Sequence, residues 1–255
     1  MCLILVAWRA HPDYPLVVAA NRDEFFSRPT APAAFWQDVP QVLAGRDLDA
    51  GGTWMGVART GRFAALTNFR DPAQNRSGAP SRGRLVADFL AGKETPQAYL
   101  ERIAAHGRLC NGYNLLVGDG ATLWWSSNMG GAPCALQPGV YGVSNHLLDT
   151  PWPKVGAGKT ALAQALERLP DDQALFALLQ DDGIHPDVHL PQTGVPLEWE
   201  RLLSSAFVKS PDYGTRSSTV LCVEQDGWAS FDEQTWLPGA KPGERRRYRF
   251  MSQAS

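Results

Sequence analysis

The chain opens with two short apolar segments separated by a turn, and this pattern predicts a β-hairpin. Residues 2–8 are apolar at every position, and residues 16–20 repeat the pattern. Between them, His11-Pro12-Asp13 is typical of a turn. Continuous apolar runs without polar alternation predict strands that are buried on both faces. We therefore expect the two segments to pair antiparallel at the centre of a sheet.

The rest of the chain alternates between groups of predicted strands and pairs of predicted helices. Strand-like segments lie at residues 51–57, 63–68, 113–117, 122–126, 140–144, 218–223 and 228–231, and helix-like segments at 84–91, 96–105, 158–169 and 172–179. Thr95 followed by Pro96 marks the start of the second helix, because threonine is a common N-cap and proline favours the first helical position. Residues 25–49, 70–83 and 180–213 are expected to be loops.

This order of elements predicts an α+β fold with mainly antiparallel sheets. Nothing in the pattern forces a split into two domains, so we expect one domain spanning residues 1–255. A short basic tail from about residue 240 contains Arg245-Arg246-Arg247-Tyr248-Arg249. We interpret it as a solvated end in preference to a nucleic-acid-binding arm.

Four consecutive polar residues, Asn21-Arg22-Asp23-Glu24, follow the second apolar segment. The predicted hairpin returns them to the beginning of the chain, beside residue 2. Because side chains alternate along a strand, Asn21 and Asp23 share one face, and Arg22 and Glu24 share the other. Polar groups at the end of a buried strand are costly unless they are bonded. They are either a solvated strand end with a local salt bridge or part of a functional site.

Cys2 offers a candidate nucleophile at the very start of the first strand. If Met1 is removed, one residue carries both a thiol and an α-amine, whose reference pKa values of about 8.5 and 7.7–8.0 make proton exchange easy. An N-terminal nucleophile brings its own base in this way. The alternative is a buried cysteine that simply begins a strand.

Composition narrows the classes of protein that fit. Hydrophobic residues make up 44% of the chain and charged residues 20%, which allows a sizeable core. The net charge of −2 argues against nucleic acid or an anionic membrane as partner. No window approaches the ~20 apolar residues of a membrane span, and no leader segment is visible. The four cysteines lack metal-site spacing and are typical of free thiols in a reducing compartment. We therefore expect a cytoplasmic protein with no metal site.

Seven sequence blocks, taken together with Cys2, closely resemble the NRDE family, also called the transport and Golgi organisation family. The blocks are residues 19–25 (AANRDEF), 51–54 (GGTW), 64–68 (AALTN), 111–115 (NGYNL), 141–145 (YGVSN), 150–152 (TPW) and 216–220 (RSSTV). The resemblance extends from Cys2 to about Phe231, which is nearly the whole chain.

The resemblance implies the fold of the N-terminal-nucleophile (Ntn) hydrolases: a four-layer αββα sandwich with two stacked, mainly antiparallel sheets between helical layers. It also implies similarity to the cysteine amidases of that superfamily, the penicillin V and bile-salt hydrolases. By this similarity Cys2 matches their nucleophile, Asp23 the acid that holds the α-amine, Asn145 an oxyanion-hole residue and Arg216 a late arginine near the nucleophile. Those amidases usually carry another arginine at the position of Ala20, so the resemblance leaves Arg216 as the candidate cation.

Two functions follow from the resemblance. The first is hydrolysis of a non-peptide amide C–N bond in a small amphipathic substrate, which requires no cofactor. The second is binding and trafficking of haem or an acyl-CoA in the same cleft without chemistry, with haem as a carried ligand. For either function the expected ligand contacts are Asn21, Arg22, Glu24, Trp54 and Asn68.

Overall fold

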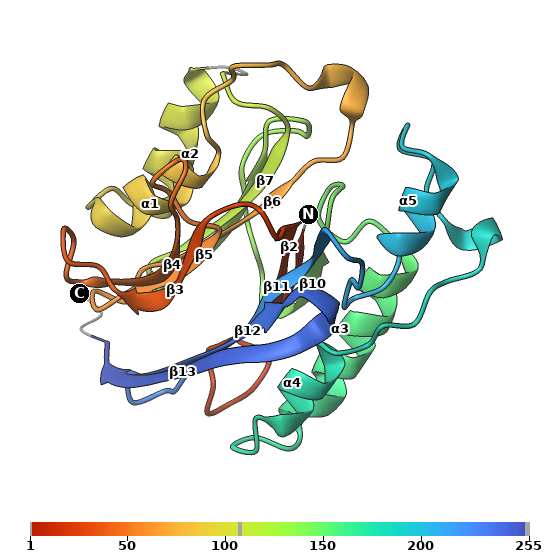
Figure 1. Cartoon of the computed structure of the whole chain (residues 1–255). Coiled ribbons are helices and arrows are strands. Elements are labelled where there is room, and N and C mark those ends of the chain that lie inside the picture. Colours follow the sequence, from red (N-terminus) through yellow and green to blue (C-terminus); the bar gives the residue numbers. More distant parts are fainter. Residues whose placement is uncertain (1, 107–108, 253–255) are drawn as a thin grey trace.

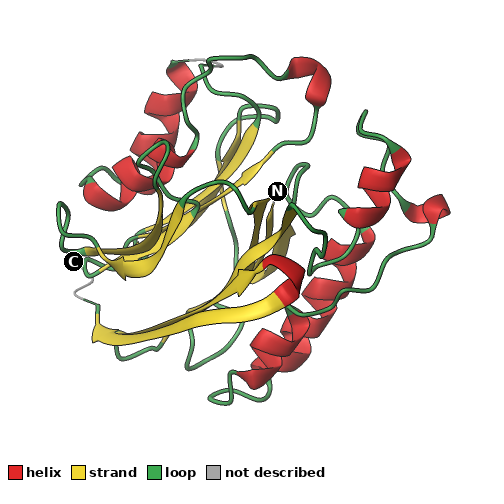
Figure 2. Cartoon of the chain, in the orientation of Figure 1, coloured by secondary structure: helices red, strands yellow, loops and turns green. Residues whose placement is uncertain are grey.

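Two antiparallel β-sheets lie face to face between two layers of helices (Figure 1). The computed structural model describes residues 2–106 and 109–252. The colouring by secondary structure in Figure 2 shows helices on the outer side of each sheet, so the layers run helix, sheet, sheet, helix. The four-layer αββα sandwich expected from the sequence is confirmed.

Within the described residues, the first sheet has six strands in the order β10-β1-β2-β11-β12-β13. Their bounds are β1 Cys2–Trp8, β2 Leu16–Phe25, β10 Gly139–Val143, β11 Tyr213–Val223, β12 Trp228–Leu237 and β13 Lys241–Met251. The second sheet has seven, in sequence order from β3 to β9. These are β3 Thr30–Phe35, β4 Val42–Asp47, β5 Met55–Ala58, β6 Phe63–Asn68, β7 Tyr113–Gly118, β8 Leu123–Ser127 and β9 Cys134–Ala135.

The predicted hairpin of β1 and β2 forms the middle of the first sheet. The two strands pair antiparallel, with Cys2 opposite Arg22 and Trp8 opposite Leu16. Strand β10 lies on the far side of β1, and β11 on the far side of β2. Leu3 and Leu5 pack into the core beneath the helices, whereas alternate side chains from Ile4 onward pack into the core between the sheets. Burial on both faces explains why the sequence of β1 shows no polar alternation.

Two pairs of helices cover the sandwich. Helices α1 Gly83–Ala91 and α2 Pro96–Ala105 cover the second sheet, and α3 Pro153–Leu166 and α4 Gln173–Leu178 cover the first. Thr95 caps α2 as expected, its hydroxyl accepting from the backbone N–H of Ala98. Helix α3 begins five residues earlier than predicted because Pro153 occupies its first turn. A Cβ on Gly158 would lie 2.8 Å from Leu5 Cδ1, so glycine lets α3 approach β1 closely.

The remaining short helices are α5 Leu197–Leu202 and the 3₁₀ turns η1 Pro72–Gln74, η2 Asp187–His189 and η3 Pro238–Ala240. No helix in the described ranges is long and apolar enough to cross a membrane.

The segment 25–49, expected to be a loop, contains the strands β3 and β4 instead. Strand β3 includes Pro32, and its pairing with β4 is interrupted between Ala31 and Ala34. Proline lacks the N–H that a ladder needs, but it is tolerated at an edge and at a bulge, and β3 is the edge strand of its sheet. The prolines of this segment therefore mark an edge strand where the sequence pattern indicated a loop.

The basic segment after residue 240 is strand β13 and not a solvated tail. It pairs with β12 along most of its length, and Phe250 is buried against the inter-sheet core. Its arginines face carboxylates of the same region: Arg245 and Arg247 contact Asp232, Arg246 contacts Glu244 and Arg249 contacts Glu224. These carboxylates neutralise most of the positive charge of the strand, with Arg245 and Arg247 sharing Asp232.

The packing of α3 on β1 predicts a large effect for one core substitution. Leu5→Ala should lower the free energy of unfolding by about 2–5 kcal/mol, because Leu5 is fully buried between strand and helix. Leu48→Ala is the matched control, since Leu48 is 57% exposed, and should change stability by less than about 0.5 kcal/mol. Urea unfolding measures both. Equal midpoints for the two variants would contradict the packing described here.

Candidate functional site

A polar cleft of about 340 Å³ opens between the two sheets at the Cys2 end of β1. Six residues singled out from the sequence line it: Cys2, Arg22, Asp23, Glu24, Trp54 and Asn68. Cys2 and the polar residues of β2 come from the first sheet, whereas Trp54 and Asn68 come from the second. The two sheets thus bring together residues that lie between 30 (Glu24 to Trp54) and 66 (Cys2 to Asn68) positions apart in the sequence.

Arg22 places a positive charge on the Cys2 side of the sheet. The two residues are cross-strand partners, and directly opposite side chains in an antiparallel pair project from the same face. The Arg22 guanidinium lies 4.3 Å from the centre of the Trp54 ring and donates to Thr30 Oγ1 at 3.2 Å. A positive charge expected from Arg216 therefore lies on β2 in this structure, although position 20 is alanine.

Competing influences act on the Cys2 thiol. Burial raises its pKa, and so does the negative charge of Asp23. A hydrogen bond from the Asp23 backbone N–H and the charge of Arg22 act in the opposite direction. Burial has the largest effect, so the thiol is protonated at neutral pH and needs a proton acceptor before it reacts.

Asp23 projects from the other face of β2, into a fully buried environment. Its Oδ1 accepts a hydrogen bond from Thr215 Oγ1 at 2.7 Å. Burial raises the pKa of this carboxyl, while the nearby charge of Lys154 opposes the rise. Lys154 is itself buried; its ammonium donates to the carbonyl oxygens of Leu203 and Ser205, and burial lowers its pKa to about 8.

A buried ion pair lies next to this group. Arg70 Nη1 donates to Glu200 Oε2 at 2.6 Å, and each side chain is at most 4% exposed. The other carboxylate oxygen of Glu200 accepts from Thr193. Sequence analysis missed Arg70, Lys154 and Glu200, because two of them lie in segments interpreted as loops and nothing local distinguishes them from solvated charges.

Asn145 lies behind the cleft rather than in its wall. It is fully buried, and its side-chain nitrogen donates to the carbonyl oxygen of Asn68 at 2.8 Å. Ser144 links it to Cys2, since the serine hydroxyl lies 3.0 Å from the carbonyl oxygen of Cys2 and 3.3 Å from Asn145 Oδ1. A side-chain amide has two N–H groups, and the contact with Asn68 uses one of them.

Besides Asn145, two other residues singled out from the sequence lie outside the cleft. Asn21 faces the helical layer, where its nitrogen donates to the carbonyls of Leu179 and Ala206 and its oxygen accepts from Ser218. These bonds give it a structural role, which corrects its assignment as a ligand contact. Arg216 sits at a bulge of β11 and donates to the carbonyls of Phe25 and Arg28. It therefore holds the chain after β2 and does not line the Cys2 cleft.

Arg216 instead lines a neighbouring cavity of about 350 Å³ that shares Arg22 and Trp54 with the cleft. Glu233 also lines this cavity and was not singled out from the sequence. Its Oε1 accepts from the backbone N–H of Ala33 at 2.6 Å. Burial raises the pKa of Glu233 to about 7, against the opposing effect of that hydrogen bond and of Arg22.

The two arginines can be distinguished by the reactivity of the thiol. Arg22→Gln should slow alkylation of Cys2 by iodoacetamide at pH 7 by more than about twofold, because loss of the nearby cation raises the thiol pKa and lowers the fraction of thiolate. Arg216→Gln is the matched control and should leave the rate within about twofold, because Arg216 contacts backbone carbonyls away from Cys2. Rates follow from mass spectrometry of the labelled peptide. If Arg216→Gln slowed alkylation more than Arg22→Gln did, Arg216 and not Arg22 would be the cation that acts on the Cys2 thiol.

Glu233 should make stability depend on pH. Below about pH 4.5 both the native and unfolded states hold its proton, and above about pH 7 neither does. Between these values only the native state holds it, so the free energy of unfolding falls as pH rises, by about 1.4 kcal/mol per pH unit from this group. Glu233→Gln should remove that contribution in urea unfolding at pH 5 and 7. Glu198→Gln is the matched control, because its side chain is 83% exposed, and it should keep the wild-type difference in the free energy of unfolding between pH 5 and pH 7. If Glu233→Gln also keeps that difference, the prediction is refuted.

Comparisons with known proteins agree with this fold. Residues 1–238 match the family model described as Transport and Golgi organisation 2. The chain is 40% identical to the bovine (Bos taurus) protein "Transport and Golgi organization protein 2 homolog" over 95% of both chains, and 35% identical to the Homo sapiens homologue over 100% of both. Among solved structures, it resembles the Caenorhabditis elegans N-acylethanolamine-hydrolyzing acid amidase orthologue, with a TM-score of 0.51, 13% identity and coverage of 86% of this chain and 92% of that one.

The likeness to the amidase concerns the fold alone, which is that of the Ntn hydrolases. The family model covers nearly the whole chain, and the bovine and human relatives align along almost their entire length. The chain therefore belongs to the Transport and Golgi organisation 2 family, also known as the NRDE family.

Proposed function

We propose that this protein is a cysteine hydrolase of the N-terminal-nucleophile type that cleaves an amide C–N bond in a small amphipathic substrate. The observation that carries the proposal is the position of Cys2, which begins the central strand β1, lines the polar cleft and lies opposite Arg22. The proposal requires removal of Met1, a residue that lies outside the described part of the chain. Cys2 then carries the free α-amine.

The reaction begins with transfer of the thiol proton to the α-amine of Cys2. The thiolate attacks the substrate carbonyl carbon, and the resulting tetrahedral intermediate carries a negative oxygen. The C–N bond then breaks, the leaving amine takes the proton from the α-ammonium, and a thioester remains. Water attacks the thioester with the α-amine as base, which releases the carboxylic acid and restores the thiol.

The residues around Cys2 have distinct roles in this scheme. Arg22 stabilises the thiolate as the proton leaves, because a nearby cation favours the charged sulfur. Asp23 stabilises the α-ammonium from the opposite face of the strand. Asn145 is buried behind the cleft wall and holds the cleft-lining Asn68 through its carbonyl oxygen, so it supports the site without touching the intermediate.

A second candidate is binding of an acyl-CoA in the same cleft without hydrolysis. The observation that favours it is the presence of three arginines in the cleft wall, at positions 22, 28 and 82. Arg28 pairs with Asp47 at 2.7 Å, and Arg82 donates to the carbonyl of Gly112 at 3.0 Å. Arginine is well suited to phosphate groups. The polar wall favours this ligand over haem, whose large ring requires apolar surroundings.

The hydrolase proposal is tested by substitution of the nucleophile. The intact mass of the purified protein should show that Met1 is absent. Against a panel of N-acyl amides, Cys2→Ala should reduce turnover to background, since no other group supplies the thioester. Cys134→Ala is the matched control, because Cys134 is exposed and lies outside the cleft, and it should retain full activity.

Undiminished turnover by Cys2→Ala would refute the hydrolase proposal.

Acyl-CoA binding makes a different prediction for Cys2→Ala. Cys2→Ala should then keep its affinity for the acyl-CoA, while Arg82→Gln should weaken it by roughly tenfold, as expected for loss of a partly buried contact between charged groups. Isothermal titration calorimetry measures both affinities, and equal affinities for Arg82→Gln and the wild type would contradict this candidate.

A further inference from the structure

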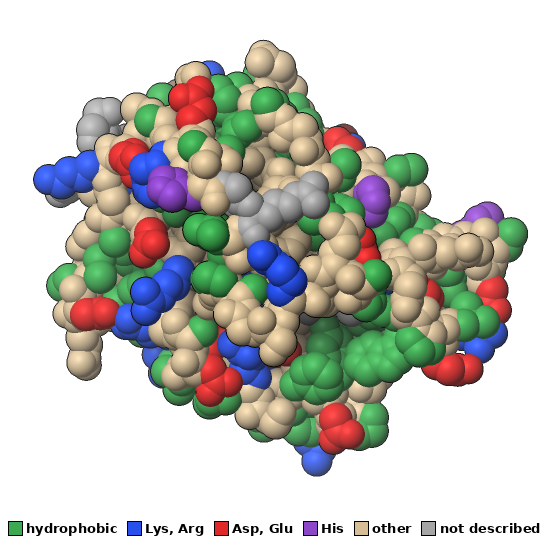
Figure 3. Space-filling view, turned by 90° about the horizontal axis from the view of Figure 1, so that it is seen from above, with side chains coloured by type: hydrophobic (Ala, Val, Ile, Leu, Met, Phe, Trp, Pro, Cys, Tyr) green, Lys and Arg blue, Asp and Glu red, His purple; other side chains and the backbone are tan. Residues whose placement is uncertain are grey.

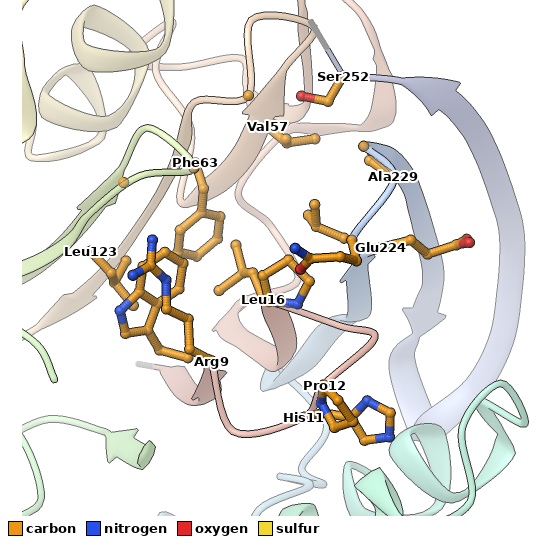
Figure 4. A pocket seen from close by; sticks show the side chains of 18 residues that line it. Arg9, His11, Pro12, Leu16, Val57, Phe63, Leu123, Glu224, Ala229 and Ser252 are labelled. Carbon is orange, nitrogen blue, oxygen red and sulfur yellow. The ribbon is translucent and has the colours of Figure 1, made fainter. Parts of the chain in front are cut away.

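A second cavity lies at the opposite end of the sandwich from Cys2. Its volume is about 420 Å³, larger than that of the cleft, and it opens where the turns after β1, β5, β7 and β11 come together. Figure 4 shows Leu16, Phe63 and Leu123 projecting into the space between the two sheets. Strand β1 separates the two sites: Cys2 is at one end and Trp8 at the other, about 20 Å apart for seven extended residues.

The walls of this cavity are apolar and belong to the inter-sheet core. Trp8, Leu16, Val57, Phe63 and Leu123 line it, and each also belongs to the core cluster between the sheets. Known small-molecule pockets have volumes of about 300–1,000 Å³ and mostly apolar walls with a few polar groups. This cavity matches that description more closely than the polar cleft at Cys2 does.

At the mouth of the cavity, the positive charge of Arg9 has no acidic partner among the described residues. Arg9 is exposed, with its guanidinium 4.8 Å from the centre of the Trp8 ring and one nitrogen donating to the carbonyl oxygen of Ala121 at 2.7 Å. Among the described residues it makes no ion pair. Glu224 is turned away from the cavity in Figure 4, and its carboxylate lies 3.0 Å from Arg249 of β13. The acid is therefore neutralised, whereas Arg9 is held in place by a neutral partner.

We propose that this cavity binds a single-chain amphiphile with one anionic head group, of the class of a medium-chain carboxylate. The tail lies between the sheets against Leu16 and Phe63, and the carboxylate contacts Arg9 at the mouth. Facing sheets are about 10 Å apart, a spacing that accepts one chain in place of interdigitated side chains. The site is independent of Cys2 and of the hydrolase chemistry.

Binding is tested with sodium decanoate by calorimetry, with 1-decanol as the neutral probe of equal length. Val223 lines the cavity at the end of β11 and is only partly buried, so Val223→Phe fills the mouth from its side. This variant should weaken decanoate binding by roughly tenfold or more. Val188→Phe, the same substitution at a residue 84% exposed and outside the cavity, is the matched control and should bind as the wild type does. Wild-type affinity in a folded Val223→Phe would overturn the proposal.

The head group is tested separately. Arg9→Gln should weaken decanoate binding by about three- to fivefold, the size of an exposed ion pair, and leave decanol binding unchanged. If Arg9→Gln weakened decanoate and decanol binding equally, the proposed contact between Arg9 and an anionic head group would be refuted. Cys2→Ala should not change decanoate binding; a loss there would place decanoate in the Cys2 cleft instead and refute the second site.

Fluorescence locates the ligand without changing the cavity wall. A decanoate carrying bromine on its terminal carbon should quench part of the tryptophan emission of the wild-type protein, because Trp8 lines the cavity. Trp8→Phe should abolish that part of the quenching. Identical quenching in the two proteins would overturn the proposal even if Val223→Phe fails to fold.

Discussion

The pairing of β1 with β2 determines what lies at both ends of the sandwich. In the observed register Cys2 faces Arg22, and Trp8 faces Leu16. A slip of one residue would turn every side chain of one strand to the other face. Arg22 would then enter the helical layer, and Asn21 would lose its bonds to Leu179 and Ala206. The apolar residues of both strands would remain buried after such a slip, so the polar residues at the end of β2 are what select the register.

The polar residues beneath the cleft show that stability here depends on complete pairing. Removing an ion from water costs several kcal/mol, and only good partners offset that cost. Asp23 is bonded by Thr215, Lys154 by two carbonyl oxygens, and Arg70 by Glu200. Loss of one partner would leave a buried charge uncompensated. An apolar core of similar volume would avoid this cost of desolvation. In the proposed hydrolase the charged arrangement supports Asp23.

Local sequence patterns were sufficient for the central hairpin and for α1 and α2, because each shows the periodicity of its own element. They failed for β3 and β13. Both are edge strands, and the proline of β3 and the arginines of β13 are residue types that the sequence pattern assigned to a loop and to a solvated tail. Arg22 lies opposite Cys2 because of the register of the two strands. That register depends on the turn between them, and the residue types of the strands alone do not predict it. Arg70 and Glu200 are 130 residues apart, and only the packed fold shows that they meet. Alternation along β2 did predict correctly that Arg22 and Asp23 occupy opposite faces.

That alternation also places the thiol and the main-chain nitrogen of Cys2 in different surroundings. The thiol of Cys2 faces the cleft between the sheets, on the side of Arg22, whereas Asp23 projects toward the helices and lies among buried polar groups. The main chain of Cys2 lies in the plane of the sheet between these two environments, and its carbonyl accepts from Ser144. In the proposed reaction a cation therefore stabilises the sulfur and an anion stabilises the amine. Burial keeps the thiol protonated in the resting protein, and in the proposed reaction stabilisation of the two charges on either side of the strand lowers the cost of moving the thiol proton to the amine.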